Sequence, residues 1–441
     1  MLYPIITLFR SCYGLSRLWE FQSVASRDYP QAEIDWQWRD TCYRNHGGDY
    51  GPSIIQSLSH DLEVEQWANI GTQCIGNKAV FQIVGEGKTL LDCVAHLSRL
   101  TDDDILKLIP HTWSIKIKHL GKMKGPSPRE AKAQIEEFRD VFNALAHRPV
   151  DLQSPDSELW LLKDCRRLEQ SDTSSKPPEI HYHWLLKRIK PTIKVGAHQL
   201  AIQSDIKKRA FISTTTMPSD RALLMANLAQ FNKGGVVLDP FCGSAGLLLS
   251  SSLLGAKVVG GDLDVKLLSH QDQPLSYPAS IGRPLRGIEK VSFGDSFTEL
   301  GLAEPTLLLG ADIKDPNVIE MYLALNHDQP YDAIVTDPPY GIRESRSQMD
   351  PFELLARLCE LAEGVLKNQG RMVMLQLIAG AFEQVDLIKK DLLLNIEKTL
   401  HPYQINMYSL SLDRFNTRHL RATIVLIKQD RTGIAQTIAT Q

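Results

Sequence analysis

The sequence predicts an α/β protein: a parallel, doubly wound sheet in the second half, preceded by a separate α+β region. After about residue 209, short segments rich in Val, Ile and Leu end in Gly, Pro or Asp and alternate with helical segments. This pattern is typical of parallel strands covered by helices on both faces. The chain has 441 residues, 43% hydrophobic and 23% charged, which suits a globular chain of two to three domains.

The first half carries both strand and helix periodicities, which is why we expect an α+β region there. Residues 78–87 (KAVFQIVGEG) and 112–122 (TWSIKIKHLGK) are predicted strands, and residues 89–100 (TLLDCVAHLSRL) and 128–146 (PREAKAQIEEFRDVFNALA) are predicted helices. Two stretches rich in Ser, Pro and Asp, 151–160 and 171–180, are predicted to be loops or a linker.

The second half alternates strands with helices. The predicted strands are contained in 234–240 (GGVVLDP), 256–264 (AKVVGGDLD), 306–316 (TLLLGADIKDP), 331–339 (YDAIVTDPP) and 370–377 (GRMVMLQL). The clearest helices are 245–255 (AGLLLSSSLLG) and 352–368 (FELLARLCELAEGVLKN). Ligands of such sheets bind beyond the carboxyl ends of the strands, where the aspartates of these motifs stand.

The first of these strands leads into a candidate cofactor site. Asp239 ends the strand, Gly243 and Gly246 follow in a turn that enters a helix, and Asp262 ends the next strand. Glycines let the backbone approach a ligand, and Asp262 is placed to accept hydrogen bonds from ribose hydroxyls. Asp239 would repel a pyrophosphate but suits an amine or a sulfonium. The pattern therefore favours S-adenosylmethionine over NAD, with Asp312 as a candidate acceptor for the adenine amino group; a simple loop aspartate is the alternative there.

A second motif, Asp337, Pro338, Pro339 and Tyr340, follows the strand in 331–339. The prolines lack N–H groups, so this loop presents acceptors without competing donors. The Asp337 carboxylate and a proline carbonyl can together hold both hydrogens of an aromatic NH₂ group, while Tyr340 stacks on the base. Catalysis by orientation and charge stabilisation follows, without a metal ion.

The net charge is −3, so an RNA surface has to be local. A basic stripe between 187 and 209 is the candidate for phosphate contact, although a solvated basic face explains it equally well. It comprises Lys187, Arg188, Lys190, Lys194, Lys207, Lys208 and Arg209. A second cluster comprises Lys116, Lys118, Lys122 and Lys124. The seven cysteines form no CxxC pair, which argues against a zinc site.

Two longer motifs are more specific than the short ones described above. They are residues 211–230 (FISTTTMPSDRALLMANLAQ) and 336–344 (TDPPYGIRE). With D-P-F-x-G-x-x-G at 239–246, the chain resembles the eukaryotic form of the tRNA guanine-10 N2-methyltransferase family from about residue 75 onward. The resemblance implies a ferredoxin-like segment (1–65), a THUMP-type RNA-binding domain (66–205) and a Rossmann-like methyltransferase domain (206–441).

The resemblance also assigns roles and partners. It places cofactor binding on Thr216 and Met217 as well as on the glycine turn and its aspartates, and catalysis on residues 337–340. It implies transfer of a methyl group to the guanine N2 of tRNA, with tRNA and a small zinc-binding activator subunit as partners. Pro218 departs from the family, which usually has an acid there, and the turn has fewer glycines than usual.

Several alternatives stay open. The substrate could instead be the guanine N2 of rRNA or snRNA, or an adenine N6, and a catalytically inactive RNA-binding scaffold is a further alternative. We expect a cytoplasmic protein without a membrane segment, because no apolar run approaches the roughly 18 residues that span a bilayer. A targeting segment at the N-terminus, which matches the family poorly, is the remaining alternative.

Overall fold

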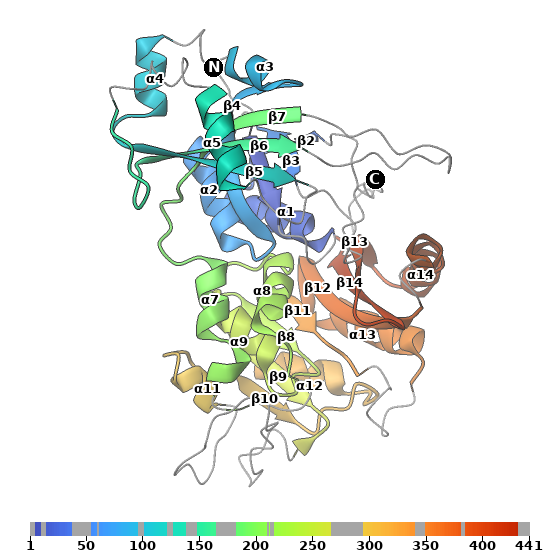
Figure 1. The fold of residues 1–441 in the computed structure, drawn as a ribbon. Coiled ribbons are helices and arrows are strands. Elements are labelled where there is room, and N and C mark those ends of the chain that lie inside the picture. Colours follow the sequence, from blue (N-terminus) through green and yellow to red (C-terminus); the bar gives the residue numbers. More distant parts are fainter. Residues whose placement is uncertain are drawn as a thin grey trace.

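The computed structural model contains two large β-sheets with helices packed on them, and helix α1 (Ser16–Asp28) lies between the sheets (Figure 1). The structure describes residues 5–9, 15–37, 54–59, 61–95, 101–120, 127–137, 148–164, 182–209, 211, 216–265, 294–339, 349–380 and 384–430. Tyr340, Lys122, Lys124 and the predicted loop 171–180 lie outside these residues.

The first sheet has seven described strands in the order β2 (Asp35–Gln37), β3 (Ile54–Leu58), β1 (Ile5–Phe9), β4 (Asn77–Gly87), β7 (Tyr182–Arg188), β6 (Ser157–Asp164) and β5 (Trp113–Leu120). The described pairings are antiparallel apart from β5–β6, which is parallel. Strands from both predicted N-terminal segments, 1–65 and 66–205, therefore share one sheet. The domain boundaries themselves stay a prediction.

Helices of the first half pack on this sheet. Helix α1 and α2 (Val64–Gln73) bury Phe21, Trp67 and Ile70 against β1 and β4. Helices α3 (Leu90–Ala95) and α4 (Asp102–Leu108) enclose a second cluster with β5, β6 and β7. Helix α5 (Pro128–Glu137) completes this half. The predicted strands 78–87 and 112–122 are confirmed, as are the helices 89–100 and 128–146 over the residues that the structure describes.

The prediction of a loop over residues 151–160 is wrong for its last four residues, which begin strand β6. This strand pairs with β5 on one side and β7 on the other. Its side chains are buried on both faces, with Leu159 and Leu161 on one face and Trp160 and Leu162 on the other. A strand buried on both faces shows no alternation of apolar and polar residues, so the preceding Ser, Pro and Asp residues dominated the sequence pattern.

The second sheet has the described order β10 (Thr306–Leu309), β9 (Lys257–Asp262), β8 (Val236–Asp239), β11 (Tyr331–Thr336), β12 (Leu366–Ala379), β14 (His419–Lys428) and β13 (Ile405–Arg414). The strands from β10 to β12 are parallel, as the sequence predicts. The hairpin of β13 and β14 pairs antiparallel with β12 and was not predicted.

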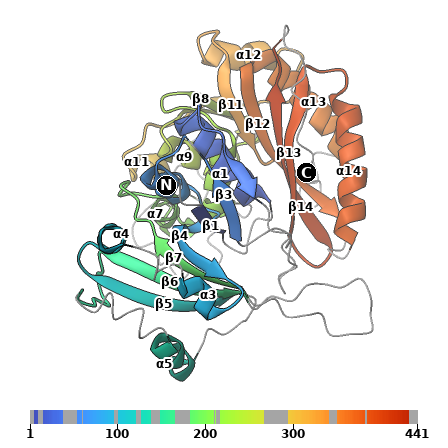
Figure 2. The ribbon, with the colours of Figure 1, turned by 90° about the horizontal axis from the view of Figure 1, so that it is seen from above.

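Helices cover both faces of the second sheet (Figure 2). One face carries α7 (Ala197–Gln203), α8 (Ser219–Leu228) and α9 (Gly246–Leu253). The other carries α12 (Val318–Leu325), α13 (Pro351–Val365) and α14 (Val385–Leu400). Local sequence sets where α13 begins: the Asp350 side chain accepts hydrogen bonds from the N–H groups of Phe352 and Glu353, and Pro351 occupies the first turn. A single turn of 3₁₀ helix, η3 (Ile206–Lys208), and the short α11 (Asp295–Thr298) complete the described elements.

Among the described residues, no helix combines the length and the apolar character that crossing a membrane requires. The same part of the chain contains no group of three or more His, Cys, Asp or Glu side chains arranged to hold a metal ion.

Candidate active site

The carboxyl ends of β8, β9 and β11 lie next to one another at the centre of the second sheet. Strand β8 has β9 on one side and β11 on the other, so the chain connections diverge from it in both directions. Such a switch in strand order leaves a crevice beyond the strand ends, where ligands of open α/β sheets bind. Asp239 ends β8, Asp262 ends β9, and Asp337 directly follows β11. The fold therefore brings the three predicted carboxylates to one edge.

A hydrogen bond connects the two predicted motifs directly. The Thr336 hydroxyl donates to Oδ1 of Asp239 at 2.7 Å, and the backbone N–H of Phe241 donates to the same oxygen at 3.1 Å. Thr336 is the residue immediately before Asp337 and is fully buried. Thr336 was not among the predicted site residues, although a polar residue that ends an apolar strand directly before an Asp-Pro-Pro loop is a usable signal.

Asp239 is an unusual carboxyl group because it is almost completely buried, with 1% of its surface exposed. Burial is the main cause that raises its pKa to about 8; the charges of Asp337 and Asp262 contribute to the rise, and its two hydrogen bonds oppose it. A cation placed beside this group would reverse that effect and favour the ionised form. The site therefore favours a ligand with a positive charge, as the cofactor prediction requires.

The glycine turn after β8 is held to β9 by Asp262. The N–H of Gly243 donates to Oδ2 of Asp262 at 2.9 Å, and the N–H of Asp264 donates to Oδ1 at 2.9 Å. Burial raises the pKa of Asp262. Gly243 has φ +48°, a conformation that favours glycine, and the space that a side chain would fill there is open. This turn leaves room for a ligand beside the backbone.

Strand β9 has no room for a side chain at Gly261, the residue before its last. A Cβ atom on Gly261 would lie 1.9 Å from the Tyr322 hydroxyl oxygen, which reaches over from α12. Tyr322 is fully buried, and its hydroxyl has no hydrogen-bond partner among the residues that the structure describes. Gly261 and Tyr322 thus fill the space beneath Asp262 together. The sequence contains no signal for this contact, because the two residues lie on different elements.

Thr216 and Met217 lie beside the glycine turn. The Thr216 hydroxyl is 2.8 Å from the Ser244 hydroxyl, within the turn itself. Met217 is buried, and its carbonyl oxygen lies 3.9 Å from the position that a Cβ atom on Gly246 would take. The structure thus brings both residues together with Gly243 and Gly246.

Asp312 lies farther out. It is exposed, it follows the end of β10 by three residues, and its side chain accepts a hydrogen bond from the N–H of Lys314 at 2.9 Å. Its role toward an adenine stays a prediction. On the loop that is predicted to be catalytic, Asp337 and Pro339 are half-buried and Pro338 is buried.

Most of the predicted basic stripe lies on or near the surface. Lys190, Lys194, Lys207 and Lys208 are exposed. Lys187 is half-buried, its ammonium donates to the Lys107 carbonyl at 3.3 Å, and burial lowers its pKa.

Glu158 on β6 forms ion pairs with one residue of the second basic cluster and one residue of the basic stripe. Its carboxylate lies 2.7 Å from the Lys116 ammonium and 3.2 Å from the Arg188 guanidinium. Burial raises the pKa of Glu158, but the bonds from Lys116 and Trp160 and the charge of Arg188 outweigh this and lower it. The carboxylate therefore partly neutralises the two cations beside it.

The structure argues against one residue of the stripe, because Arg209 is buried, with 3% of its surface exposed. Its guanidinium donates to the Ser204 carbonyl at 2.9 Å and to the Ser219 hydroxyl at 3.2 Å, and it lies against Gly246. Burial lowers its pKa to about 10. Arg209 therefore ties η3 to the start of α8 and does not reach a surface where RNA could bind. Charge patterns in a sequence do not distinguish a buried arginine from an exposed one.

The fold and the site define a class of protein, and one family matches it. A central parallel sheet with a glycine turn after one strand and an Asp-Pro-Pro loop after its neighbour is a Rossmann-like methyltransferase arrangement. Residues 310–389 match the family described as "RMKL-like, methyltransferase domain". The matched segment contains β11 and the Asp-Pro-Pro loop.

Curated proteins similar to the chain are named tRNA (guanine(10)-N(2))-methyltransferase. The Bos taurus protein is 28% identical over 304 residues, which are 67% of this chain and 59% of that protein. The Xenopus laevis protein is 29% identical over 307 residues, 69% and 59% of the respective chains. The Saccharomyces cerevisiae protein is 24% identical over 300 residues, 67% and 60%. The similarity predicted from the motifs is thus confirmed, and the chain spans about three fifths of the length of these relatives.

Solved structures also align with the chain. TrmN from Thermus thermophilus has a TM-score of 0.45 and 16% identity, and the alignment covers 97% of this chain and 100% of that one.

Proposed function

We propose that the protein transfers a methyl group from S-adenosylmethionine to the exocyclic N2 of guanine in tRNA, at guanosine 10. The observation that carries the proposal is the hydrogen bond from Thr336 to Asp239, because it fixes the Asp-Pro-Pro loop beside the glycine turn. A methyl donor in the turn and an amine on the loop would then be neighbours. The names of the curated relatives support the choice of substrate.

The cofactor pocket would be formed by residues of three strand ends. When bound, S-adenosylmethionine supplies an electrophilic methyl group on a positively charged sulfur. Asp239 would provide the negative charge that this cation needs, and Asp262 would accept from the ribose hydroxyls. Thr216, Met217, Gly243 and Gly246 would line the turn, and Asp312 would accept from the adenine amino group.

The catalytic loop would hold the amine for attack. The Asp337 carboxylate and the Pro338 carbonyl each accept one N–H of the guanine NH₂ group, which turns the nitrogen lone pair away from the ring. Pro338 and Pro339 contribute no competing backbone donors. The Asp337 carboxylate stabilises the positive charge that grows on nitrogen and then accepts its proton. Tyr340 stacks on the guanine, which has left its helical stack to reach the loop.

RNA would bind over the exposed lysines of the first sheet and of the segment that leads to the second. Lys116 and Lys118 on β5, together with Lys187, Arg188, Lys190, Lys194, Lys207 and Lys208, are the proposed phosphate contacts. Such contacts position the RNA but do not read its sequence. Arg209 is left out, because it is buried.

By resemblance, the proposal includes a small zinc-binding activator subunit as a partner and the cytoplasm as the compartment. Co-purification of a zinc-containing subunit with the chain expressed at its natural level supports the first point, and fluorescence microscopy of the tagged chain tests the second.

A methylation assay on tRNA transcripts tests the proposal. We expect the purified protein, with its activator subunit, to label wild-type tRNA from radioactive S-adenosylmethionine. A transcript in which guanosine 10 is replaced by adenosine should stay unlabelled. Equal labelling of the two transcripts excludes position 10, and labelling of rRNA or snRNA alone assigns the enzyme to another RNA.

A further inference from the structure

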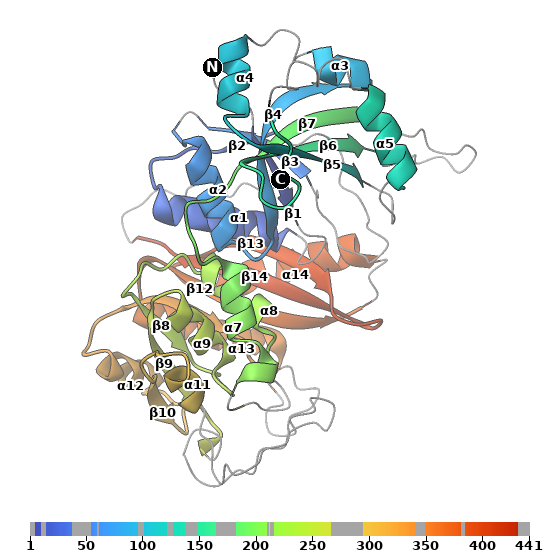
Figure 3. The same cartoon turned by 60° about the vertical axis from the view of Figure 1, so that its left-hand side comes forward.

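Helix α1 belongs to the first sheet by sequence but also forms part of the layer that covers the second sheet. Helix α9 packs on β8 and β11 and helix α8 packs on β12, whereas α1 lies beside α8 and contacts β13 (Figure 3). Trp19 of α1 meets Tyr408 of β13 edge to face at 5.8 Å between ring centroids. The N–H of Ser16 donates to the Ser411 hydroxyl of β13 at 3.1 Å. The two halves of the chain thus share one helix.

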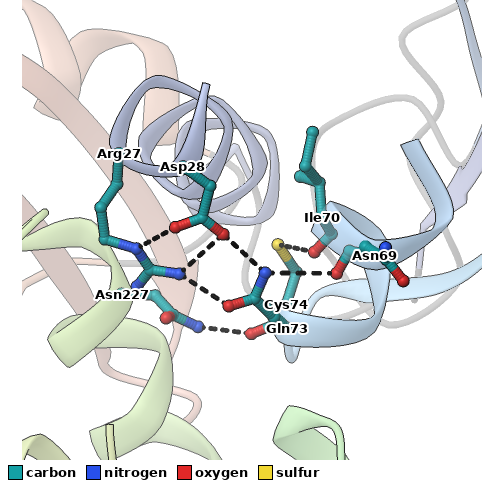
Figure 4. Close-up of polar contacts among 7 residues, drawn as sticks. All are labelled: Arg27, Asp28, Asn69, Ile70, Gln73, Cys74 and Asn227. Carbon is teal, nitrogen blue, oxygen red and sulfur yellow. Dashed lines mark hydrogen bonds and ion pairs between the residues drawn. The ribbon is translucent and has the colours of Figure 1, made fainter. Parts of the chain in front are cut away.

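Asn227, near the end of α8, stands at the centre of this junction. Its amide nitrogen donates one hydrogen to Oε1 of Glu20 on α1 and the other to the Gln73 carbonyl at the end of α2, both at 2.8 Å. Figure 4 shows the side chain reaching toward Gln73. Asn227 is fully buried. Asn227, on a helix that packs on the second sheet, therefore bonds to α1 and α2, the two helices that pack on β1 and β4 of the first sheet.

The two acceptors are themselves held firmly. The Glu20 carboxylate is fully buried and also accepts the N–H groups of Ile75 and Gly76, each at 2.8 Å. The Gln73 side chain donates to Asp28 at 2.7 Å and accepts from Arg27 at 2.8 Å (Figure 4). Because Glu20 and Gln73 are held by these other bonds, the two hydrogen bonds of Asn227 fix the orientation of α8 relative to α1 and α2. Both acceptors are oxygen atoms, so the Asn227 amide must point its nitrogen toward them. A flipped amide would place Oδ1 against two acceptor oxygens.

Arg371 provides a second anchor at the junction. It lies at the beginning of the buried part of β12, opposite Ala333 of β11, and donates to the Ser23 hydroxyl of α1 at 2.8 Å and to the Leu228 carbonyl at 3.0 Å. Its guanidinium lies 4.0 Å from the centre of the Tyr408 ring. Strand β11, the neighbour of β12, leads into the catalytic loop. The junction is therefore built on the strands that position that loop.

We propose that Asn227 is a positioning residue for methyl transfer: its two hydrogen bonds to α1 and α2 fix the first sheet relative to the catalytic loop, and so determine which nucleotide of a bound RNA reaches Asp337. The inference rests on the proposed function. A polar contact of this kind is oriented, whereas an apolar contact tolerates sliding and rotation. Asn227 thus contributes an orientation that burial of apolar surface does not.

Asn227→Asp tests this role with an almost isosteric change. The new carboxylate faces two oxygen acceptors, so both bonds are lost and the charge of Glu20 repels it. Asn227→Ser removes the amide and keeps at most one donor, on a shorter side chain and without added charge, and serves where the aspartate variant does not fold. Asn395→Asp is the matched control, because the Asn395 side chain donates to the Asp391 carbonyl of its own helix α14, at 2.9 Å. For each variant, calorimetry measures cofactor affinity, and mass spectrometry measures the rate and the position of methylation on tRNA.

We expect both Asn227 variants to bind the cofactor within about twofold of the wild type, because the glycine turn is untouched. Methylation at the target guanine should fall by about tenfold or more, and methyl groups should appear at other guanines, because a small misplacement of the reacting groups is costly. Asn395→Asp should change neither quantity.

Methylation of the same single guanine at the wild-type rate by both Asn227 variants overturns the inference and leaves the proposed function intact. If the wild type methylates another RNA instead of tRNA, the proposed function fails, and the same comparison on that RNA decides the role of Asn227.

Discussion

Asp239→Asn is expected to stabilise the protein without its cofactor and to weaken cofactor binding. The pKa of Asp239 is raised from 3.8 to about 8 by burial. At neutral pH the carboxyl group is therefore protonated in the folded chain and ionised in the unfolded chain. An asparagine mimics the protonated carboxyl group, and its Oδ1 can still accept from Thr336 and Phe241, but it has no proton to release on unfolding.

The magnitude follows from linkage. Because the folded pKa is the raised one, wild-type stability is complete below about pH 4 and decreases as the pH rises toward 8. Each unit of pKa difference corresponds to about 1.4 kcal/mol, so the loss at pH 7 is about 4 kcal/mol. This is an upper bound, because relaxation around the ionised group reduces it. A gain of about 2 kcal/mol in the variant corresponds to a rise in Tm of about 4–8 °C for a domain of this size.

Thermal unfolding of both proteins at pH 5 and pH 8, without cofactor, measures this effect. We expect the Tm of Asp239→Asn to exceed that of the wild type by more at pH 8 than at pH 5, and the affinity for S-adenosylmethionine to fall by at least about tenfold, since an ionic partner is lost. A variant that is less stable than the wild type, or a Tm difference that is the same at both pH values, refutes the reasoning.

Three further predictions concern the packing at Gly261, the role of Arg209 and the backbone at Gln369. Gly261→Ala should lower the free energy of unfolding by about 1–3 kcal/mol, because its Cβ would meet the Tyr322 hydroxyl at 1.9 Å. Adding Tyr322→Phe should restore part of this loss, as measured by denaturant unfolding. If the double variant recovers no stability, the contact is not the cause. Arg209→Met should lower Tm and leave the salt dependence of tRNA binding unchanged. Lys207→Ala should leave Tm unchanged and reduce the slope of log K against log salt by about 1. The reverse pattern would mean that Arg209 contacts RNA. Gln369→Gly should stabilise the chain by about 1 kcal/mol, because Gln369 has φ +62°, and a destabilised variant excludes this explanation.

Local sequence patterns were sufficient to predict which residues end the parallel strands of the second sheet. Asp239, Asp262 and Asp337 each follow a short apolar run that is buried and parallel in the structure, so their positions at one edge of the sheet were predictable. The order of the strands was not predictable from periodicity, because it depends on contacts between elements far apart in the chain. The contact of Thr336 with Asp239 follows from that order.

The errors of the sequence prediction have the same origin. Arg209 and its exposed neighbour Lys208 look alike in a charge count, and only packing against Gly246 and Ser219 separates them. The first residues of β6 follow a polar segment, and their burial on both faces depends on neighbours more than twenty positions away. The antiparallel hairpin of β13 and β14 had no local signal strong enough to be singled out.

The proposed function depends on the Asp337 carboxylate, and methylation by Asp337→Asn measures what that carboxylate contributes. The asparagine keeps the shape of the loop but turns one acceptor into a donor that faces the guanine amine. Single-turnover methylation of tRNA, read by mass spectrometry of the nucleoside at position 10, should fall by about a thousandfold, while cofactor affinity stays within about threefold. Formation of N2-methylguanosine by the variant at the wild-type rate contradicts the account.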